Sequence, residues 1–199
     1  MQSLGVAGLL RLAVETLQSP KRTLRMVLDF VITMPELLQI TAFVVALSTL
    51  LTALTPVPPD MTIPLVQWFY ANVLILFALQ YVVFLGLAGL MTIIGQMFQG
   101  HGTFKESLTA LVWLQFIVFG ISLIQLFFAV TIPQVNVIIF LFSIMAMVHL
   151  TVAFIMEVHG FNNAVLVFAG VVGTFIGVVF SLVFIFVLLG ITPEVAPHV

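Results

Sequence analysis

The feature that most constrains this chain is its long intervals without a formally charged residue. Its 199 residues include five Lys or Arg and seven Asp or Glu, so charged side chains make up 6% of the sequence and hydrophobic ones 63%. A soluble domain carries about 25% charged residues to cover its surface, and a disordered chain is more polar still. We therefore predict an all-α, polytopic integral membrane protein, because helices satisfy their own backbone hydrogen bonds in lipid.

Five apolar stretches lie between the charged positions, and each is long enough to cross a hydrocarbon core of about 30 Å as a helix. The first follows Pro35 and Glu36, which suit a first helical turn. The second follows a proline-rich turn at 55–64 and is longer than one crossing needs, so we expect it to tilt or to protrude. A polar break at 132–136 separates the third span from the fourth. The predicted spans cover about 37–54, 65–95, 107–131, 137–156 and 164–190, within a transmembrane domain at 35–190 that a short tail at 191–199 follows.

The basic residues lie on one side of this five-helix arrangement. Four of the five precede the first span, and Lys105 lies in the loop at 96–106, which an even number of crossings places on the same side. Basic loops stay in the cytoplasm during insertion. We predict that the N-terminus and the loops at 96–106 and 157–163 are cytoplasmic, whereas the loops at 55–64 and 132–136 and the C-terminus face outward.

Residues 1–34 form an N-terminal arm rather than a signal peptide, because Arg11 and Glu15 interrupt its apolar stretch. Ser19 and Pro20 suit the start of a helix, behind which apolar and basic residues occupy different faces. The apolar face carries Leu24, Val27, Leu28 and Val31, and the basic face carries Lys21, Arg22 and Arg25. We predict an amphipathic helix in the headgroup plane with its basic face toward anionic lipid; docking of a protein partner is the alternative.

A few polar side chains lie inside the predicted spans and are candidates for function. They are Asn72, Gln80, Gln115, Gln125 and His149. Uncharged groups at such positions join helices more often than they relay protons. Gln115 and His149 lie at similar distances from the cytoplasmic ends of consecutive antiparallel spans. We predict an interhelical hydrogen bond between these two side chains.

The fifth span contains Gly173 and Gly177, one helical turn apart. This spacing lets a second helix approach closely, either from the same bundle or from another copy of the chain. We predict a helix-packing role for the two glycines.

Residue types that support catalysis or cofactor binding do not occur in recognisable patterns. The chain has no cysteine, which excludes disulfides and thiolate chemistry, and its net charge of −2 argues against a nucleic-acid partner. Serine-hydrolase, phosphate-loop and dinucleotide signatures are missing. The histidines and carboxylates that could bind a metal lie on separate loops without a short ligand spacing: His101, Glu106, His149, Glu157 and His159. We expect no catalytic residue, cofactor or metal.

Three segments give the chain a resemblance to a known family. They are Glu15–Arg25 before the first span, the Gly-rich Gly95–Ala110 leading into the third, and Glu157–Ala164 before the last. In this order they resemble the bacterial branch of the YIP (Ypt-interacting protein) domain family, and the likeness covers most of the chain. It implies five spans, a cytoplasmic N-terminus and a bacterial inner membrane.

The resemblance carries limited functional content. Eukaryotic members of that family are adaptors for prenylated Rab-type GTPases, but their long cytoplasmic N-terminal domain has no counterpart in the arm of this chain. The family supplies no catalytic residues.

Three functions fit the sequence in decreasing order. The first is a non-enzymatic membrane scaffold or adaptor, whose partners are the lipid bilayer and other membrane proteins or a second copy, with no small-molecule substrate identified. The second is a small transporter or channel with Asn72, Gln80, Gln115 and His149 along a polar path. The third is a membrane enzyme that uses His101, Glu157 and His159.

Overall fold

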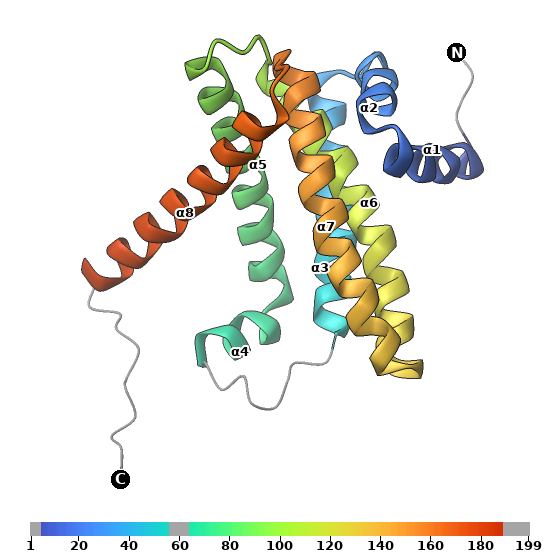
Figure 1. The fold of residues 1–199 in the computed structure, drawn as a ribbon. Helices are drawn as coiled ribbons and strands as arrows, with labels where there is room; N and C mark the ends of the chain where they lie inside the picture. The colour runs from blue at the N-terminus through green and yellow to red at the C-terminus, as the bar shows by residue number, and fades with distance from the viewer. Residues whose placement is uncertain (1–4, 56–63, 189–199) are drawn as a thin grey trace. The chain divides into compact units, whose positions relative to one another are not determined.

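The computed structural model describes residues 5–55 and 64–188, and every regular element among them is an α-helix (Figure 1). The helices are α1 (Val6–Gln18), α2 (Pro20–Leu28), α3 (Met34–Leu54), α4 (Pro64–Ala71), α5 (Val73–Met97), α6 (Phe104–Thr131), α7 (Pro133–His159) and α8 (Ala164–Leu188). Five of them are long and apolar enough to cross a membrane: α3, α5, α6, α7 and, over Ala164–Ser181, α8. The predicted fold class, an all-α polytopic membrane protein, is confirmed.

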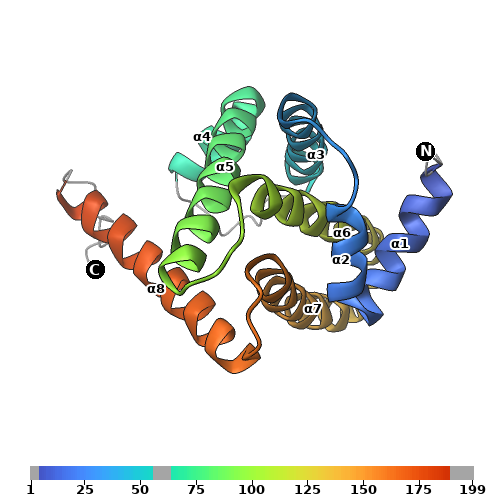
Figure 2. The same ribbon diagram turned by 90° about the horizontal axis from the view of Figure 1, so that it is seen from above.

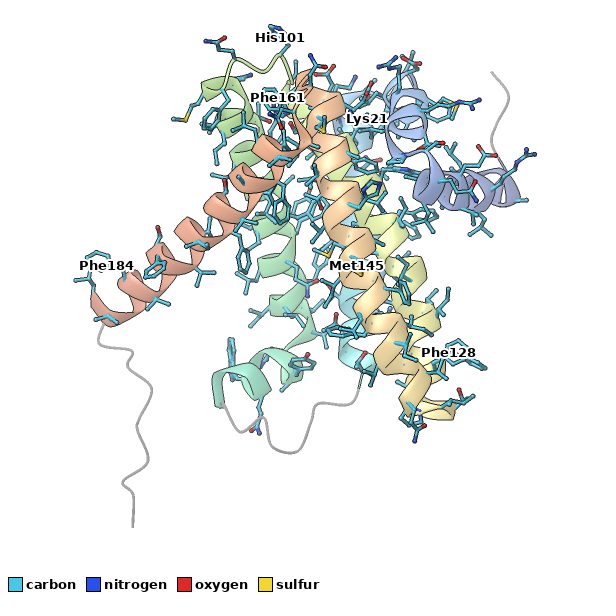
Figure 3. The ribbon with its side chains drawn as sticks, viewed as in Figure 1. Lys21, His101, Phe128, Met145, Phe161 and Phe184 are labelled. Carbon is cyan, nitrogen blue, oxygen red and sulfur yellow. The ribbon has the colours of Figure 1, made fainter. Side chains whose placement is uncertain are left out.

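The chain divides into two compact units, Met1–Asn162 and Asn163–Val199, which we describe separately. In the first unit, α6 contacts each of the other spanning helices, α3, α5 and α7 (Figure 2). The polypeptide passes up and down through these four helices, so that α2, the loop at 98–103 and the last turns of α7 meet at one end (Figure 1). We call this region the α2 end. Figure 3 places Lys21 and His101 there and Phe128 toward the opposite end.

Packing is tightest at the α2 end. One apolar cluster joins α2, α6 and α7 through Leu24, Trp113 and Phe154, and a second joins α3, α5 and α6 through Leu37, Ala88 and Leu108. The buried residues of α6 run from Ser107 to Ile117 and those of α7 from Leu150 to His159. Both sets belong to the half of each helix nearest this end, which therefore holds the protein core of the unit.

Two spanning helices begin with the same local structure. The Glu36 carboxylate accepts hydrogen bonds from the Thr33 backbone N–H and hydroxyl, both at 2.7 Å, at the start of α3. The Glu106 carboxylate accepts from the backbone N–H and hydroxyl of Thr103 in the same way at the start of α6, at 2.8 and 2.7 Å. A Thr-x-x-Glu sequence at a helix start satisfies backbone donors that have no intrahelical partner.

The second and fourth spans differ from the predicted boundaries. The single helix expected over 65–95 is two helices, α4 and α5, that meet at Asn72, whose ψ of 68° is not helical. The loop expected over 132–136 shortens to Ile132, because Pro133 starts α7 instead of breaking it. Proline lacks the N–H that a first helical turn leaves unsatisfied, so it is tolerated there.

The N-terminal arm packs on the bundle. Leu24 is fully buried and Val27 nearly so, in the cluster that contains α6 and α7 residues. Val31 was expected on the same apolar face but is 86% exposed, because α2 ends at Leu28 and Asp29 caps it. That the arm also lies on anionic lipid stays a prediction.

The second unit contains α8, which begins after Asn163. The Asn163 side-chain oxygen accepts from the backbone N–H groups of Val165 and Leu166 at 3.0 and 3.1 Å, as expected of a helix cap. Gly173 and Gly177 lie within α8 on one face. The end of the predicted fifth span at 189–190, the tail at 191–199 and most of the turn at 55–64 lie outside the described residues.

Candidate functional site

The imidazole of His159 occupies the centre of the α2 end. It lies in the last turn of α7, is 1% exposed and stacks on the Phe161 ring with the ring centroids 5.5 Å apart. Its Nδ1 is 3.3 Å from the carbonyl oxygen of Ile155, and its Nε2 is buried without a hydrogen-bond partner among the described residues. The ring therefore acts mainly through shape, filling the space between α5, α7 and the loop at 98–103.

Three glycines make room for this ring. A Cβ at Gly95 would lie 1.9 Å from His159 Nε2, one at Gly100 2.7 Å from the His159 Cβ, and one at Gly102 2.6 Å from the Val158 side chain. The backbone N–H of His101 also donates to the His159 carbonyl at 3.3 Å. Any larger residue at the three glycine positions would push the loop away from α7.

Gly160 completes the turn after His159. Its φ of 74° lies in the left-handed region that favours glycine, and it ends α7 there. The next residue, Phe161, donates its backbone N–H to the Met156 carbonyl at 2.9 Å. The chain reverses so that the Phe161 ring lies against His159.

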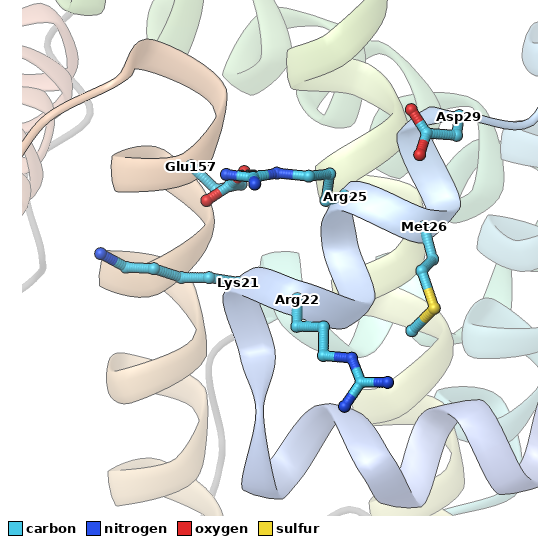
Figure 4. Close-up of a pocket in the computed structure, with 6 residues that line it drawn as sticks. All are labelled: Lys21, Arg22, Arg25, Met26, Asp29 and Glu157. Carbon is cyan, nitrogen blue, oxygen red and sulfur yellow. Dashed lines mark hydrogen bonds and ion pairs between the residues drawn. The ribbon is translucent and has the colours of Figure 1, made fainter.

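The arm joins the same region through an ion pair. Arg25 of α2 donates from Nε to Glu157 of α7 at 2.7 Å, and its Nη2 lies 2.6 Å from the same oxygen (Figure 4). The three segments that carry the family resemblance, Glu15–Arg25, Gly95–Ala110 and Glu157–Ala164, therefore meet at one place in the fold. They form the candidate functional site of the chain.

The site has an excess of unpaired basic side chains. All four glutamates among the described residues are paired: Glu15 with Arg11, Glu157 with Arg25, and Glu36 and Glu106 with helix starts. The described lysines and the remaining arginine, Lys21, Arg22 and Lys105, are exposed and make no ion pair with described residues.

A pocket of about 350 Å³ lies beside α2, and its lining includes two of these cations. In Figure 4, Lys21 and Arg22 point in different directions from α2, and Arg25 reaches Glu157. The predicted basic face is therefore divided: Arg25 joins helices, whereas Lys21 and Arg22 remain available.

A second group of polar side chains lies inside the bundle, between α3, α5 and α6. Gln115 donates from Nε2 to the Ser48 hydroxyl at 2.9 Å, and the Thr49 hydroxyl lies 2.7 Å from Gln80 Oε1. Gln80 and Gln115 line one pocket of about 240 Å³ together with Ser48 and Thr52. The structure thus brings two of the four intramembrane candidates together.

The predicted hydrogen bond between Gln115 and His149 is wrong. Gln115 pairs with Ser48 of α3, and His149 is exposed on α7. The two residues were expected to meet because their depths are similar, but depth does not decide the face of a helix. Leu114 and Ile117 of α6 contact the α7 cluster, so the intervening Gln115 is turned toward α3.

The remaining amides have local roles. Asn72 donates to the Trp68 carbonyl at 2.8 Å, across the break between α4 and α5. Gln125 of α6 donates to the Ser143 hydroxyl of α7 at 3.0 Å. Neither residue lines the pocket that contains Gln80 and Gln115.

Some contacts at these sites were not anticipated. The Trp113 indole N–H of α6 donates to the Thr16 hydroxyl of α1 at 3.1 Å, a contact across the fold that no local pattern indicates. The Thr-x-x-Glu helix starts, in contrast, have a sequence signature that would have located Glu36 and Glu106.

The described residues contain no group of three His, Asp or Glu side chains close enough to share a metal ion. His101 is exposed and His159 is buried on the neighbouring element. Comparisons of the chain with models of protein families, with curated proteins and with solved structures give no match.

Proposed function

We propose that this membrane protein is a non-enzymatic scaffold or adaptor that receives other membrane proteins at its α2 end. One observation carries the proposal. The glutamates at this end are paired within the chain, whereas Lys21, Arg22 and Lys105 are exposed and unpaired among the described residues. An ordered surface with a local excess of positive charge attracts acidic segments and anionic headgroups.

The order of that surface supports the proposal. Leu24 is buried against α6 and α7, and His159 is enclosed by glycines of the adjacent loop. A scaffold gains from such rigidity, because a preorganised surface loses less conformational entropy when a partner binds.

We further propose that the chain belongs to the bacterial branch of the YIP domain family and lies in an inner membrane. The meeting of the three resembling segments at one end of the bundle supports this assignment. The same proposal includes a cytoplasmic α2 end and an outward C-terminus, for which the basic residues argue.

The proposal is tested by purifying the tagged chain in a mild detergent and quantifying co-purified proteins by mass spectrometry. We expect at least one partner at constant stoichiometry. The variants Lys21→Glu and Arg22→Glu should each reduce its recovery several-fold, because each reverses an exposed charge at the α2 end.

Arg11→Glu is the matched control, since Arg11 is also an exposed cation of the arm but is paired with Glu15. Its partner recovery should equal that of the parent chain. A monomer without partners, or a partner that is lost equally from Arg11→Glu, would refute the proposal.

A small transporter is the second candidate, and the pocket lined by Gln80 and Gln115 favours it. A transport path through this pocket requires that Gln80→Leu and Gln115→Leu together abolish solute flux into liposomes. Flux that survives both substitutions would eliminate this path.

A further inference from the structure

The pocket between α3, α5 and α6 has polar walls within the membrane-spanning part of the bundle. Hydroxyl and amide side chains of Ser48, Thr52, Gln80 and Gln115 line its volume of about 240 Å³. At 1.5 Å per residue, Gln115 lies about 16 Å along α6 from Phe104, and Gln80 lies about 10 Å along α5 from Val73. The pocket is therefore remote from both ends of the helices that form it.

The two glutamines offer unpaired N–H donors to this pocket. Gln115 uses one N–H for Ser48, and neither its second N–H nor its carbonyl oxygen has a partner among the described residues. Gln80 is paired only through the oxygen that faces the Thr49 hydroxyl. Both amide groups thus keep hydrogen-bonding capacity that the bundle does not use.

The orientation of the Gln80 amide does not change this conclusion. The single Thr49 proton has a second acceptor, the Val45 carbonyl at 2.8 Å. If Thr49 donates to Val45, the turned Gln80 amide donates one N–H to Thr49 and still keeps its other N–H. In both orientations at least one Gln80 N–H is free for an acceptor in the pocket.

The lining selects a neutral ligand. None of the described residues around the pocket is titratable. An ion at this depth would lose its hydration without gaining a counter-charge, which is strongly unfavourable. A carbonyl oxygen accepts from amide N–H groups without that cost.

The mouth of the pocket is apolar. Val83 and Leu87, one turn apart on α5, are 51% and 46% exposed and line the same pocket as Gln80. An acyl or isoprenoid chain can leave the pocket over these side chains, while a compact head remains beside the amides.

From these observations we infer that the pocket binds a neutral lipid through a carbonyl-bearing head, held by Gln80 and Gln115. Diacylglycerols and isoprenoid quinones share this chemistry. The site is independent of the α2 end, so its loss would leave the proposed scaffold function intact.

The test is a titration of purified protein in detergent, followed by native mass spectrometry. The probes are dioctanoylglycerol and decylubiquinone, which distinguish the two lipid sources, and dioctanoyl phosphatidic acid, which adds a charge to the same acyl chains. We expect one neutral probe to bind with 1:1 stoichiometry and phosphatidic acid to bind about tenfold more weakly or less.

Two variants address the pocket in different ways. Gln80→Leu removes the donor, and Val83→Trp narrows the mouth while leaving every hydrogen bond in place. Each should weaken binding about tenfold. Gln125→Leu is the matched control, because it breaks a similar amide–serine contact between helices outside the pocket, with Ser143. Its affinity should equal that of the parent.

The inference is overturned if neither neutral probe binds at 1:1 or if phosphatidic acid binds as tightly as dioctanoylglycerol. Affinities of either pocket variant within about threefold of the parent, or a Gln125→Leu loss equal to that of Gln80→Leu, would overturn it as well.

Discussion

Single residues at the α2 end act through the space that they fill or leave empty. His159 occupies a volume that exists because three neighbours lack a Cβ, and its contact with Phe161 adds a stacked ring. A glycine in a helix interior normally costs stability relative to alanine. Gly95, inside α5, is retained at that cost because α5 and α7 could not approach otherwise.

Gly95→Ala should lower the stability of the protein. The added Cβ would lie 1.9 Å from His159 Nε2, and overpacking of this kind costs about 1 to 3 kcal/mol. Thermal unfolding in detergent measures the effect. Gly86→Ala is the control on the same helix, because its Cβ meets no atom within 4 Å, and it should be neutral or stabilising. Equal destabilisation by the two variants would contradict this account.

The contact between Gly95 and His159 predicts a coupled response. If His159→Ala removes the ring, Gly95→Ala should cost little in that background. The two changes would then be non-additive by more than about 0.5 kcal/mol. Additive effects in a double-mutant cycle would show that the ring does not restrict position 95.

The intramembrane side chains predict a contrast between two leucine substitutions. Gln115→Leu loses the hydrogen bond to Ser48 and should destabilise the protein by about 0.6 kcal/mol. His149→Leu changes an exposed residue and should stay within about 0.5 kcal/mol of the parent. Stability is compared by unfolding in detergent. A larger cost for His149→Leu than for Gln115→Leu would reverse the assignment of partners.

At the scale of elements, α2 is held to the bundle more by its apolar face than by its ion pair. Leu24 is fully buried, whereas the Arg25 side chain is 72% exposed beside Glu157. A buried leucine contributes several times more than an exposed ion pair, at about 2 to 5 against less than 1 kcal/mol.

Leu24→Ala should therefore release α2, while Arg25→Gln should leave it docked. Hydrogen exchange of the backbone amides in Pro20–Leu28 reports the difference: we expect loss of protection only in Leu24→Ala. Leu10→Ala is the control for leucine truncation in the arm, because Leu10 is 56% exposed. Release of α2 by Arg25→Gln alone would contradict the dominant role of the apolar face.

Elements were more predictable than contacts. The five spanning helices follow from the charge-free intervals, since lipid leaves a long apolar segment little choice but a helix. The break at Asn72 was not predicted, because an uninterrupted apolar run hides a change of helix direction. Pro133 was read as a breaker although a helix start tolerates it equally well. Local rules left both choices open.

The site shows where sequence reasoning stops. The three resembling segments could be named, but their meeting depends on helix rotation and loop geometry. Similar depth suggested the pair Gln115 and His149, whereas rotation of α6 directs Gln115 toward Ser48. The role of Gly95 also required the structure, because its partner, His159, is 64 residues away in the chain.

At the scale of the whole molecule, the central claim concerns sidedness. The α2 end gathers the loop at 98–103, the end of α7 and the exposed cations Lys21 and Arg22, and our functional proposal needs this end in the cytoplasm. The chain has no cysteine, so single cysteines can be introduced against an empty background.

The most direct measurement is labelling of such cysteines with a membrane-impermeant maleimide, before and after the inner membrane is opened. We predict that Arg22→Cys and His101→Cys react only after opening, whereas Gln134→Cys and His198→Cys, the latter in the tail outside the described residues, react before it. Labelling of Arg22→Cys or His101→Cys in intact cells, or protection of Gln134→Cys, would contradict the account.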